Sequence, residues 1–232
     1  MRSMFDRIAP RYDLLNRVLS AGSDVRWRRQ AVDYLGLDER ARVLDLCTGT
    51  ADLLIEALGR APGRFGVGVD LSFEMLARGA SKLLRRGIQG RAALASGDAE
   101  RLPLRAGLFD GALVAFGIRN VGERRAALAE VLRVLRPGGR LVVLEFSTPP
   151  GLLGRLYRFY FMRVLPRIGS LLSGDGGAYG YLPASVDRFP APERFAGELR
   201  AAGFAEVEWR ALTFGIAHLH RGCKAAGSRG DR

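Results

Sequence analysis

The chain has 232 residues, a length that is too short to favour two full domains. Its residues are 48% hydrophobic, which supports one sizeable core. Its formal charge of +12 would suit an anionic partner, but only Lys82 and Lys224 are lysines, and the arginines are scattered through every segment. Because no basic cluster is present, we expect no nucleic-acid partner, and the two cysteines, which lie outside any CxxC spacing, indicate neither a disulfide framework nor a zinc site.

The N-terminal stretch MRSMFDRIAPRYD has acidic residues and a proline where a signal peptide needs an apolar segment. No uncharged run approaches the roughly 18 residues that a membrane-spanning helix needs. We therefore expect a cytoplasmic protein in a reducing compartment.

From residue 42 onward, short β-rich runs alternate with amphipathic helical stretches. This alternation predicts an α/β fold with about seven mostly parallel strands and helices on both faces of the sheet. The predicted strands are 43–46, 65–70, 91–98, 109–116, 139–146, 207–212 and 213–220. Helices are predicted over 53–58, 126–135 and 193–202, and the second of these ends before Pro137-Gly138-Gly139. A further helix is predicted to begin after Ser72 as its N-cap, with Met75 and Leu76 on its buried face.

The expected organisation is a single domain over residues 1–225 with two embellishments. The first is an N-terminal helical lid at 1–38, and the second is a helical insertion at 150–180. The insertion is aromatic and basic, with no acidic residue between Phe146 and Gly174. The polar tail at 226–232 is expected to be disordered.

The segment VLDLCTGTAD at 43–52 joins the first predicted strand to the first predicted helix through a bend at Gly49. In an open α/β sheet, ligands bind outside the carboxyl ends of the strands, beside such a bend. A dinucleotide site needs GxGxxG and a P-loop needs GK[ST], and neither follows here. The bend therefore favours a ligand with an adenosine-like end and no phosphates.

Aspartates follow or end the first three strands. Asp70 is placed to accept hydrogen bonds from both ribose hydroxyls, and Asp98 with Ala99 would read an adenine edge. Asp45 would face a cationic group near Gly49. Each aspartate alone is also a routine turn or cap residue, but their order predicts a class I methyltransferase, whose cofactor S-adenosylmethionine carries a sulfonium and an ammonium.

Several longer blocks are more specific than these cofactor motifs. They are FDRIAPRYDLLNRVLS at 5–20, WRR at 27–29, TGTAD at 48–52, GDAERLP at 97–103, AFGIRNV at 115–121, LRPGGRLVVLEFS at 135–147, YLPASVDRFP at 181–190 and LTFGIAHLHRG at 212–222. With them, the chain from 5 to 224 resembles the UbiE/MenG family of quinone-biosynthesis C-methyltransferases. The resemblance implies methylation of a ring carbon of a polyprenylated quinol, either demethylmenaquinol or the 2-methoxy-6-polyprenyl-1,4-benzoquinol of ubiquinone synthesis. It also implies cofactor contacts at Thr50, Asp70, Asp98 and Ala99.

Three positions depart from the family's pattern. Ala51 stands where the family usually has the second glycine of TGTGD, Asp24 stands where a histidine is common, and Cys223 replaces the tyrosine of HRGYK. We expect Ala51 to start a helix with a negative φ, a conformation that tolerates a methyl group, so that cofactor binding survives.

The chemistry of the implied substrate points to three candidate catalytic residues. A quinol carbon becomes nucleophilic when an adjacent hydroxyl loses its proton. Arg119 is expected to stabilise the phenolate or to orient a water, because a guanidinium stays protonated. Asn120 is expected to hydrogen-bond the second ring oxygen, and Tyr12 to orient that oxygen from the lid. The alternative interpretation makes Arg119 and Asn120 a strand-end turn with a salt bridge, and Tyr12 a packing residue.

The insertion offers an apolar path for a polyprenyl tail that stays in the bilayer. Peripheral contact with the inner face of a membrane is therefore expected, with a buried lid helix as the alternative, because Pro166 interrupts the helix and its apolar residues scatter around it. The apolar residues are Leu152, Leu156, Tyr157, Phe159, Phe161 and Leu165, and the arginines that would meet headgroups are Arg155, Arg158, Arg163 and Arg167.

Two other functions each agree with part of the sequence. An RNA methyltransferase would fit the pI near 10.8, but the chain has neither an NPPY-type motif nor a catalytic cysteine pair. A cofactor-binding scaffold without chemistry would fit better if Arg119, Asp70 and Asp98 were lost. His218 and His220 share a strand face and are interpreted as packing or hydrogen-bonding residues, so no metal site is predicted. The oligomeric state stays open, with a homo-oligomer as one option.

Overall fold

The protein is described from a computed structural model that defines residues 20, 22–149, 151, 154, 163 and 184–226. The strands are β1 (Arg42–Leu46), β2 (Phe65–Asp70), β3 (Ala92–Ser96), β4 (Phe109–Ala115), β5 (Leu135–Phe146), β6 (Ala205–Leu212) and β7 (Ala217–Cys223). The α-helices are α3 (Ser23–Leu35), α4 (Asp52–Gly59), α5 (Phe73–Arg85), α6 (Arg124–Val134) and α10 (Pro192–Ala201), and the short 3₁₀ turns are η2 (Gln89–Arg91), η3 (Ile118–Asn120) and η5 (Thr213–Gly215).

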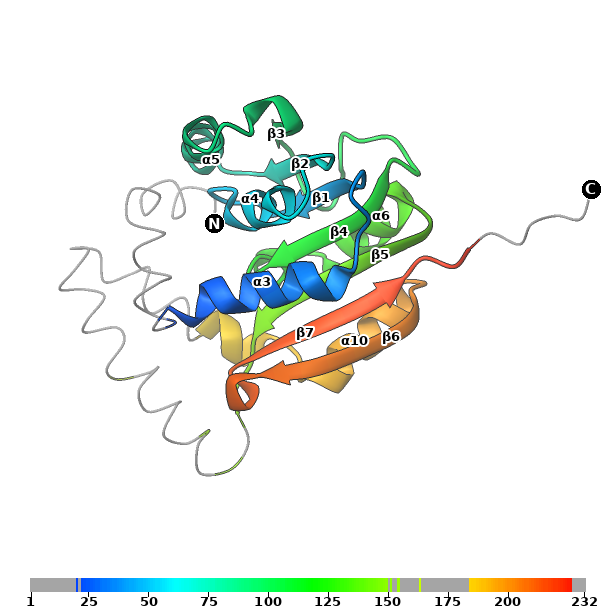
Figure 1. Ribbon diagram of the computed structural model, residues 1–232. Helices are drawn as coiled ribbons and strands as arrows, with labels where there is room; N and C mark the ends of the chain where they lie inside the picture. The colour runs from blue at the N-terminus through cyan, green and yellow to red at the C-terminus, as the bar shows by residue number, and fades with distance from the viewer. Residues whose placement is uncertain are drawn as a thin grey trace, which may run out of the picture.

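The seven strands form one sheet in the order β3-β2-β1-β4-β5-β7-β6 (Figure 1). β1 pairs in parallel with β2 on one side and β4 on the other, and β7 is antiparallel to both β5 and β6. The predicted seven-stranded, mostly parallel α/β fold is confirmed. Since the chain leaves β1 in one direction and returns later to its other side, the carboxyl end of β1 is the switch point at which such sheets bind ligands.

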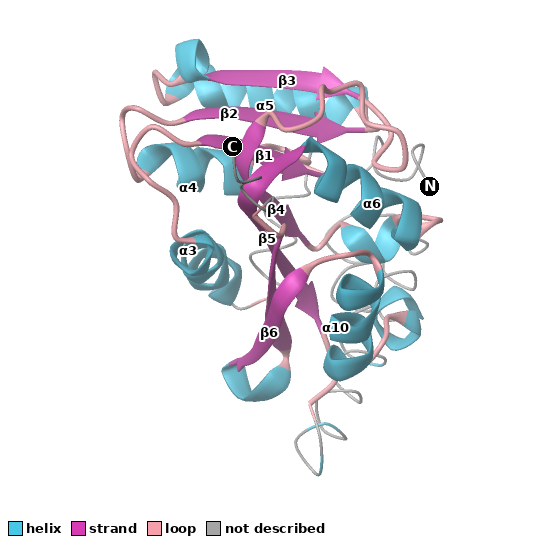
Figure 2. Ribbon diagram, turned by 90° about the vertical axis from the view of Figure 1, so that its right-hand side faces the viewer, coloured by secondary structure: helices cyan, strands magenta, loops and turns pink. Residues whose placement is uncertain are grey.

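Helices cover both faces of the sheet, with α3 and α4 on one side and α6 and α10 on the other (Figure 2). The consecutive apolar residues of β5 pack alternately against the helices on the two faces of the sheet. Val142 and Leu144 pack in the cluster with Trp27 of α3, and Leu141 and Val143 pack in the cluster with α6 and α10. A strand buried on both faces needs such an unbroken apolar run rather than an alternating one.

The helix α3 lies within the region predicted as an N-terminal lid. Figure 1 shows it running across β4 and β5, and its residues Trp27, Ala31 and Leu35 are at most 1% exposed. This helix is therefore part of the core. Residues 1–19, nearly all of the insertion and residues 227–232 lie outside the described residues, so the rest of the lid, the insertion and the tail remain predictions.

Most local predictions agree with these elements. Ser72 is the N-cap of α5, and its hydroxyl accepts a hydrogen bond from the amide of Met75 at 3.2 Å, as predicted. The predicted strand over 213–220 is wrong at its start, because η5 turns the chain there and Phe214 has a φ of 58°. Helix α6 ends at Val134 and β5 begins at Leu135, since Arg136 precedes a proline and is driven out of the helical conformation. None of the helices formed by these described residues is long and apolar enough to cross a lipid bilayer.

Candidate functional site

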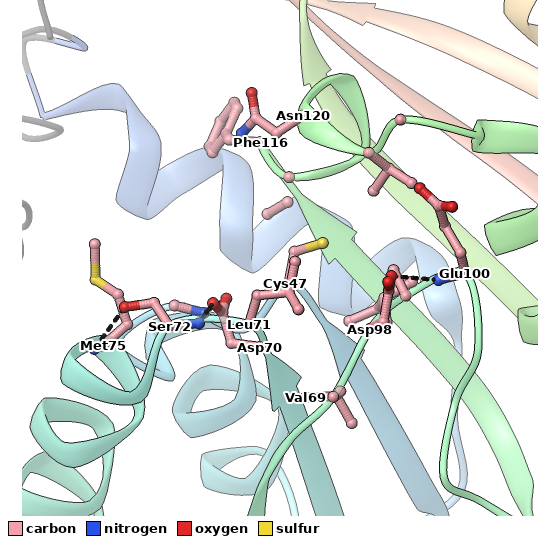
Figure 3. A pocket seen from close by; sticks show the side chains of 18 residues that line it. Cys47, Val69, Asp70, Leu71, Ser72, Met75, Asp98, Glu100, Phe116 and Asn120 are labelled. Carbon is pink, nitrogen blue, oxygen red and sulfur yellow. Dashed lines mark hydrogen bonds between the residues drawn. The ribbon is translucent and has the colours of Figure 1, made fainter. Parts of the chain in front are cut away.

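A cavity opens at the carboxyl ends of β1, β2 and β4, at the switch point of the sheet (Figure 3). Five of the predicted site residues line it: Gly49, Asp70, Asp98, Ala99 and Asn120. The others in its wall are Leu46, Cys47, Val69, Leu71, Ser72, Met75, Gly97, Glu100, Ala115, Phe116, Gly117, Val121 and Gly122. The tertiary structure thus brings together residues that follow or end four separate strands, β1, β2, β3 and β4.

The bend after β1 is fastened to the end of β2 through Asp70. One carboxylate oxygen of Asp70 accepts from the amide of Gly49 at 2.8 Å, and the other accepts from the amide of Ser72 at 2.9 Å. Gly49 has a φ of 55°, a left-handed conformation that glycine adopts without strain. Asp70 also lines the cavity, where a carboxylate is a suitable acceptor for a ligand's hydroxyl groups.

Asp98 and Ala99 form the opposite wall. Figure 3 shows Asp70 and Asp98 on either side of Cys47, with Phe116 and Asn120 beyond them. Asp98 is exposed, and its carboxylate accepts from the amide of Glu100 at 2.9 Å, which fixes the turn after β3. The cavity therefore has one acidic residue at the tip of each of two neighbouring strands.

The charge of the cavity is opposite to that of the protein as a whole. Its charged side chains are Asp70, Asp98 and Glu100, and no lysine or arginine is among the described residues that line it. In a chain of net charge +12, such a cavity favours a cationic ligand and disfavours one that carries phosphates. The residues present therefore fit S-adenosylmethionine, with its sulfonium and ammonium groups and its ribose hydroxyls.

Ala51 does not have the negative φ expected from the sequence. Its φ is 65° and its ψ is 20°, and it is the left-handed N-cap residue of α4. The bend reverses the chain within a few residues, and Cys47, Gly49 and Ala51 all take positive φ values to do so. An alanine in this conformation is strained by about 1–2 kcal/mol, so the glycine of the family's usual TGTGD has a backbone reason.

Asp45 and Thr50, both predicted to bind cofactor, do not line the cavity. The carboxylate of Asp45 is 1% exposed and accepts from the hydroxyl of Thr48 at 2.6 Å and from the amide of Leu54 at 3.1 Å. It thereby satisfies a free N–H of the first turn of α4. Burial raises the pKa of Asp45 to about 7. The hydroxyl of Thr50 accepts from Nζ of Lys82 at 2.8 Å, which ties the bend to α5.

Arg119 also faces away from the cavity. Its side chain is 7% exposed, and Nη1 lies 2.5 Å from Oε1 of Glu145 and 2.6 Å from the carbonyl of Phe116. The structure thus gives Arg119 the salt bridge at a strand-end turn that was the alternative interpretation, while its neighbour Asn120 lines the cavity. Tyr12 lies outside the described residues.

Asp24, at the position where the family commonly has histidine, is buried and paired. Its carboxylate accepts from the hydroxyl of Ser20 at 2.8 Å and forms an ion pair with Arg28 of the WRR block. Arg28 also reaches the carboxylate of Asp52 at 3.4 Å. Since Asp52 is the first residue of α4, this chain of charges connects α3 to the bend.

Among the cavity residues that were not predicted as site residues, two are in tight contact with their neighbours. Phe116 has a φ of 56°, and its ring stacks on Phe146 with centroids 4.3 Å apart. Cys47 packs so closely on Gly117 that a Cβ there would lie 2.3 Å from the Cβ of Cys47. Burial, together with the nearby carboxylates, raises the pKa of the Cys47 thiol, so it is not a nucleophilic thiolate. The sequence signal that could have identified both residues is their position, since Cys47 lies within the block DLCTGTAD and Phe116 within the block AFGIRNV.

His218 and His220 lie beside an aromatic cluster on β7. His220 packs edge-on to Phe195 and its Nε2 lies 2.9 Å from the carbonyl of Pro192, and His218 packs edge-on to Trp209. Among residues 20, 22–149, 151, 154, 163 and 184–226, no group of three potential metal-ligating side chains is assembled. The packing interpretation of both histidines agrees with these contacts.

Comparisons with known proteins agree with this geometry. The profile of the ubiE/COQ5 methyltransferase family matches residues 1–224. The chain is 52% identical over 220 residues to a protein of Thermus thermophilus named "Demethylmenaquinone methyltransferase", covering 94% of this chain and 99% of that one. It is also 52% identical over 225 residues to the "Ubiquinone/menaquinone biosynthesis C-methyltransferase UbiE" of Syntrophotalea carbinolica, covering 97% of this chain and 94% of that one.

Solved structures support the fold alone. The [4+2]-cyclase SpnF superposes with a TM-score of 0.75 at 20% identity, over 97% of this chain and 96% of that one. A Thermotoga maritima SAM-dependent methyltransferase, titled a possible histamine N-methyltransferase, superposes with a TM-score of 0.69 at 21% identity, over 97% of this chain and all of that one. The profile match and the 52% identities show that the chain belongs to the ubiE/COQ5 methyltransferase family and is an S-adenosylmethionine-dependent methyltransferase of the class I, Rossmann-like fold.

Proposed function

We propose that this enzyme methylates a ring carbon of a polyprenylated quinol, converting demethylmenaquinol to menaquinol. The observation that carries the proposal is the 52% identity, over 94% of the chain, to a protein named for demethylmenaquinone. The apolar and aromatic part of the cavity wall, formed by Val121, Phe116 and Ala115, suits a flat ring better than a charged acceptor.

The cofactor is assigned to the acidic part of the cavity. Asp70 would accept from the ribose hydroxyls, Asp98 and Ala99 would contact the adenine, and the backbone at Gly49 would face the amino-acid end. When bound, S-adenosylmethionine supplies a methyl group that is electrophilic because it is attached to a sulfonium. The acidic lining attracts this cation and leaves the product S-adenosylhomocysteine with less favourable electrostatics, which promotes its release.

The acceptor is assigned to the part of the cavity formed by the turn after β4. Asn120 would hydrogen-bond a ring oxygen and so hold the quinol with a carbon facing the methyl group. The adjacent hydroxyl would give its proton to water, which makes the ring carbon nucleophilic toward the methyl group that the cofactor supplies, and the ring would then lose the hydrogen on that carbon. Arg119 is not assigned to the phenolate, because its guanidinium is directed to Glu145 and away from the cavity. Tyr12 would orient the same ring oxygen as Asn120.

The two segments outside the described residues are assigned to the acceptor side. We propose that residues 1–19 of the predicted lid and the insertion at 150–180 enclose the ring and let the polyprenyl tail reach a membrane surface. The arginines of the insertion would contact anionic headgroups, giving peripheral membrane association of a cytoplasmic enzyme.

A second candidate substrate is the 2-methoxy-6-polyprenyl-1,4-benzoquinol of ubiquinone synthesis. The observation that favours it is the name of the Syntrophotalea carbinolica relative, which covers both quinone classes. Both substrates present a hydroxyl beside the carbon to be methylated, so the same residues would serve either.

The test is a methyl-transfer assay in detergent with radiolabelled S-adenosylmethionine. Reduced demethylmenaquinone, oxidised demethylmenaquinone, the reduced benzoquinone and total RNA are offered as parallel acceptors. Label on the reduced demethylmenaquinone and not on its oxidised form is the expected result. Label only on the benzoquinol would reassign the substrate, and label on RNA, or on no acceptor despite cofactor binding, would overturn the proposed function.

A further inference from the structure

A buried ion pair lies behind the acceptor side of the cavity. Glu145, near the end of β5, is 1% exposed, and its partner Arg119, on the turn after β4, is 7% exposed in its side chain. Neither residue lines the cavity. Burying both charges carries a desolvation penalty of several kcal/mol per ion, so a pair of this kind is weak evidence for a stabilising role.

The carboxylate of Glu145 binds more than the guanidinium. Oε2 accepts from the backbone amide of Arg119 at 3.4 Å, and Oε1 accepts from the amide of Phe146 at 2.9 Å. The guanidinium in turn donates to the carbonyl of Phe116 at 2.6 Å. The carboxylate and the guanidinium together therefore fix β5, the backbone of η3 and Phe116, the residue that follows β4, relative to one another.

These bonds stabilise a conformation that the backbone does not favour. Phe116 has a φ of 56°, which is rare for a bulky side chain and persists only where the surroundings over-determine it. Four residues close to Arg119 in the chain line the cavity: Phe116, Gly117, Asn120 and Val121. The ion pair thus determines where one wall of the cavity stands.

The pair also reaches the chain segment that follows the insertion. Nε of Arg119 lies 3.4 Å from the hydroxyl of Ser185, which is 3% exposed and is helical, as are the described residues 184–188 around it. The guanidinium therefore joins the turn after β4 to the return of the insertion into the fold.

We propose that Glu145 is a positioning residue for methyl transfer: it holds Arg119 and the turn at 116–120 so that Phe116 and Asn120 form the acceptor wall of the cavity. The proposal rests on the proposed function for the identity of the acceptor. The acids that line the cavity itself, Asp70, Asp98 and Glu100, would instead face the cofactor. Glu145 acts through the turn and does not touch the reacting atoms.

The first test compares Glu145→Gln with Glu130→Gln as a matched control. Glu130 also pairs with an arginine, Arg133, and also accepts from a backbone amide, that of Leu102, but it lies outside the cavity. For Glu145→Gln we expect kcat/KM for the quinol to fall at least about 10-fold, which corresponds to about 1.4 kcal/mol, with the Kd of S-adenosylhomocysteine changed less than about 3-fold. For Glu130→Gln we expect both constants to be unchanged.

A second variant separates positioning from folding. In the double variant Glu145→Leu with Arg119→Leu, no buried charge is left unpaired, so we expect a higher thermal stability than in either single leucine variant, with the quinol kcat/KM still at least about 10-fold low. Full recovery of activity with recovered stability would overturn the proposal. So would a parallel loss of cofactor binding and activity in Glu145→Gln, or no loss of quinol kcat/KM.

A third measurement does not depend on turnover. The ring centroid of Trp27 lies 6.2 Å from that of Phe116 and 6.0 Å from that of Phe146. The chain has two tryptophans, so the substitution Trp209→Phe leaves Trp27 as the sole tryptophan. In that background we expect Glu145→Gln, and not Glu130→Gln, to shift the emission of Trp27. An unchanged spectrum would count against the proposal. If the wild-type enzyme methylated no quinol, the proposed function would fail, and this spectrum would still decide whether Glu145 positions the turn.

Discussion

Ala51 and Gly79 are in such close contact that a Cβ on residue 79 would lie 3.1 Å from the Cβ of Ala51. Ala51 is fully buried at the bend after β1, and Gly79 lies on the buried face of α5. The family's usual TGTGD has a glycine where this chain has Ala51. The methyl group of Ala51 is accommodated because residue 79 of the neighbouring helix α5 is a glycine, which has no side chain.

This contact predicts coupling between the two positions. In the wild-type chain, Gly79→Ala should overpack the interface and destabilise the protein, although alanine is otherwise the better helix former. In the Ala51→Gly background the same change should be more favourable by at least about 1 kcal/mol. Urea unfolding of the four proteins measures this coupling, and additive effects would show that the two residues do not constrain one another.

Asp70 is predicted to be the carboxylate on which cofactor affinity depends most. Asp70→Asn leaves a single oxygen for the two amides of Gly49 and Ser72, so one amide loses its acceptor, and the ligand's hydroxyls lose an ionised partner. We expect the Kd of S-adenosylhomocysteine to rise at least about 10-fold, from a loss of about 1–3 kcal/mol. Calorimetric titration gives this value.

Asp110→Asn is the matched control for Asp70. Asp110 also accepts from a backbone amide, that of Arg42, and forms an ion pair with Arg136, but it does not line the cavity. We expect its substitution to change stability without changing the Kd. Equal weakening by both substitutions would mean that the cofactor does not bind at Asp70.

Asp45 is predicted to act as a cap for α4 rather than as a cofactor ligand. Its pKa of about 7 means that it is partly protonated near neutral pH, so an asparagine, which keeps one oxygen for the amide of Leu54, should replace it well. We expect Asp45→Asn to leave the Kd of S-adenosylhomocysteine within about 3-fold and Asp45→Ala to destabilise the fold by about 1–3 kcal/mol. A Kd for Asp45→Asn as weak as that of Asp70→Asn would place Asp45 against the cofactor.

His220 is predicted to destabilise the protein in mild acid. Burial lowers its pKa from 6.5 to about 4, so the unfolded chain binds a proton at higher pH than the folded protein does. Its contribution to stability is therefore complete above pH 6.5 and is lost as the pH falls toward 4, by about 2 kcal/mol between pH 7 and pH 5. The groups packed around it are His218, Trp209, Phe195 and the Glu193 carboxylate.

Urea unfolding at the two pH values checks this contribution. We expect His220→Phe, which keeps an aromatic ring against Phe195, to remove most of the difference in unfolding free energy between pH 7 and pH 5. Burial also lowers the pKa of the neighbouring His218, but less strongly, so His218→Phe should remove a smaller part of this difference in unfolding free energy. A wild-type slope retained in His220→Phe would assign the acid sensitivity to other groups.

The sheet could be predicted from the sequence because its determinants are local. Each strand is a short apolar run, each helix has its own period and caps, and the Ser72 cap needs only residues three apart. Where local signals compete, the prediction was wrong. TFGIAHLH reads as one strand, but the chain must reverse between β6 and β7, and η5 makes that turn with Phe214 in a left-handed conformation.

The sequence by itself determined which residues stand at strand ends, and so it placed Gly49, Asp70, Asp98, Ala99 and Asn120 at one edge of the sheet. Parallel strands bring their carboxyl ends together, whatever the side chains between them. Only the tertiary structure decided which way each side chain turns. Asp45 caps a helix and Arg119 pairs with Glu145, because a buried charge or amide takes whichever partner lies nearest in space, and that partner can come from a distant strand.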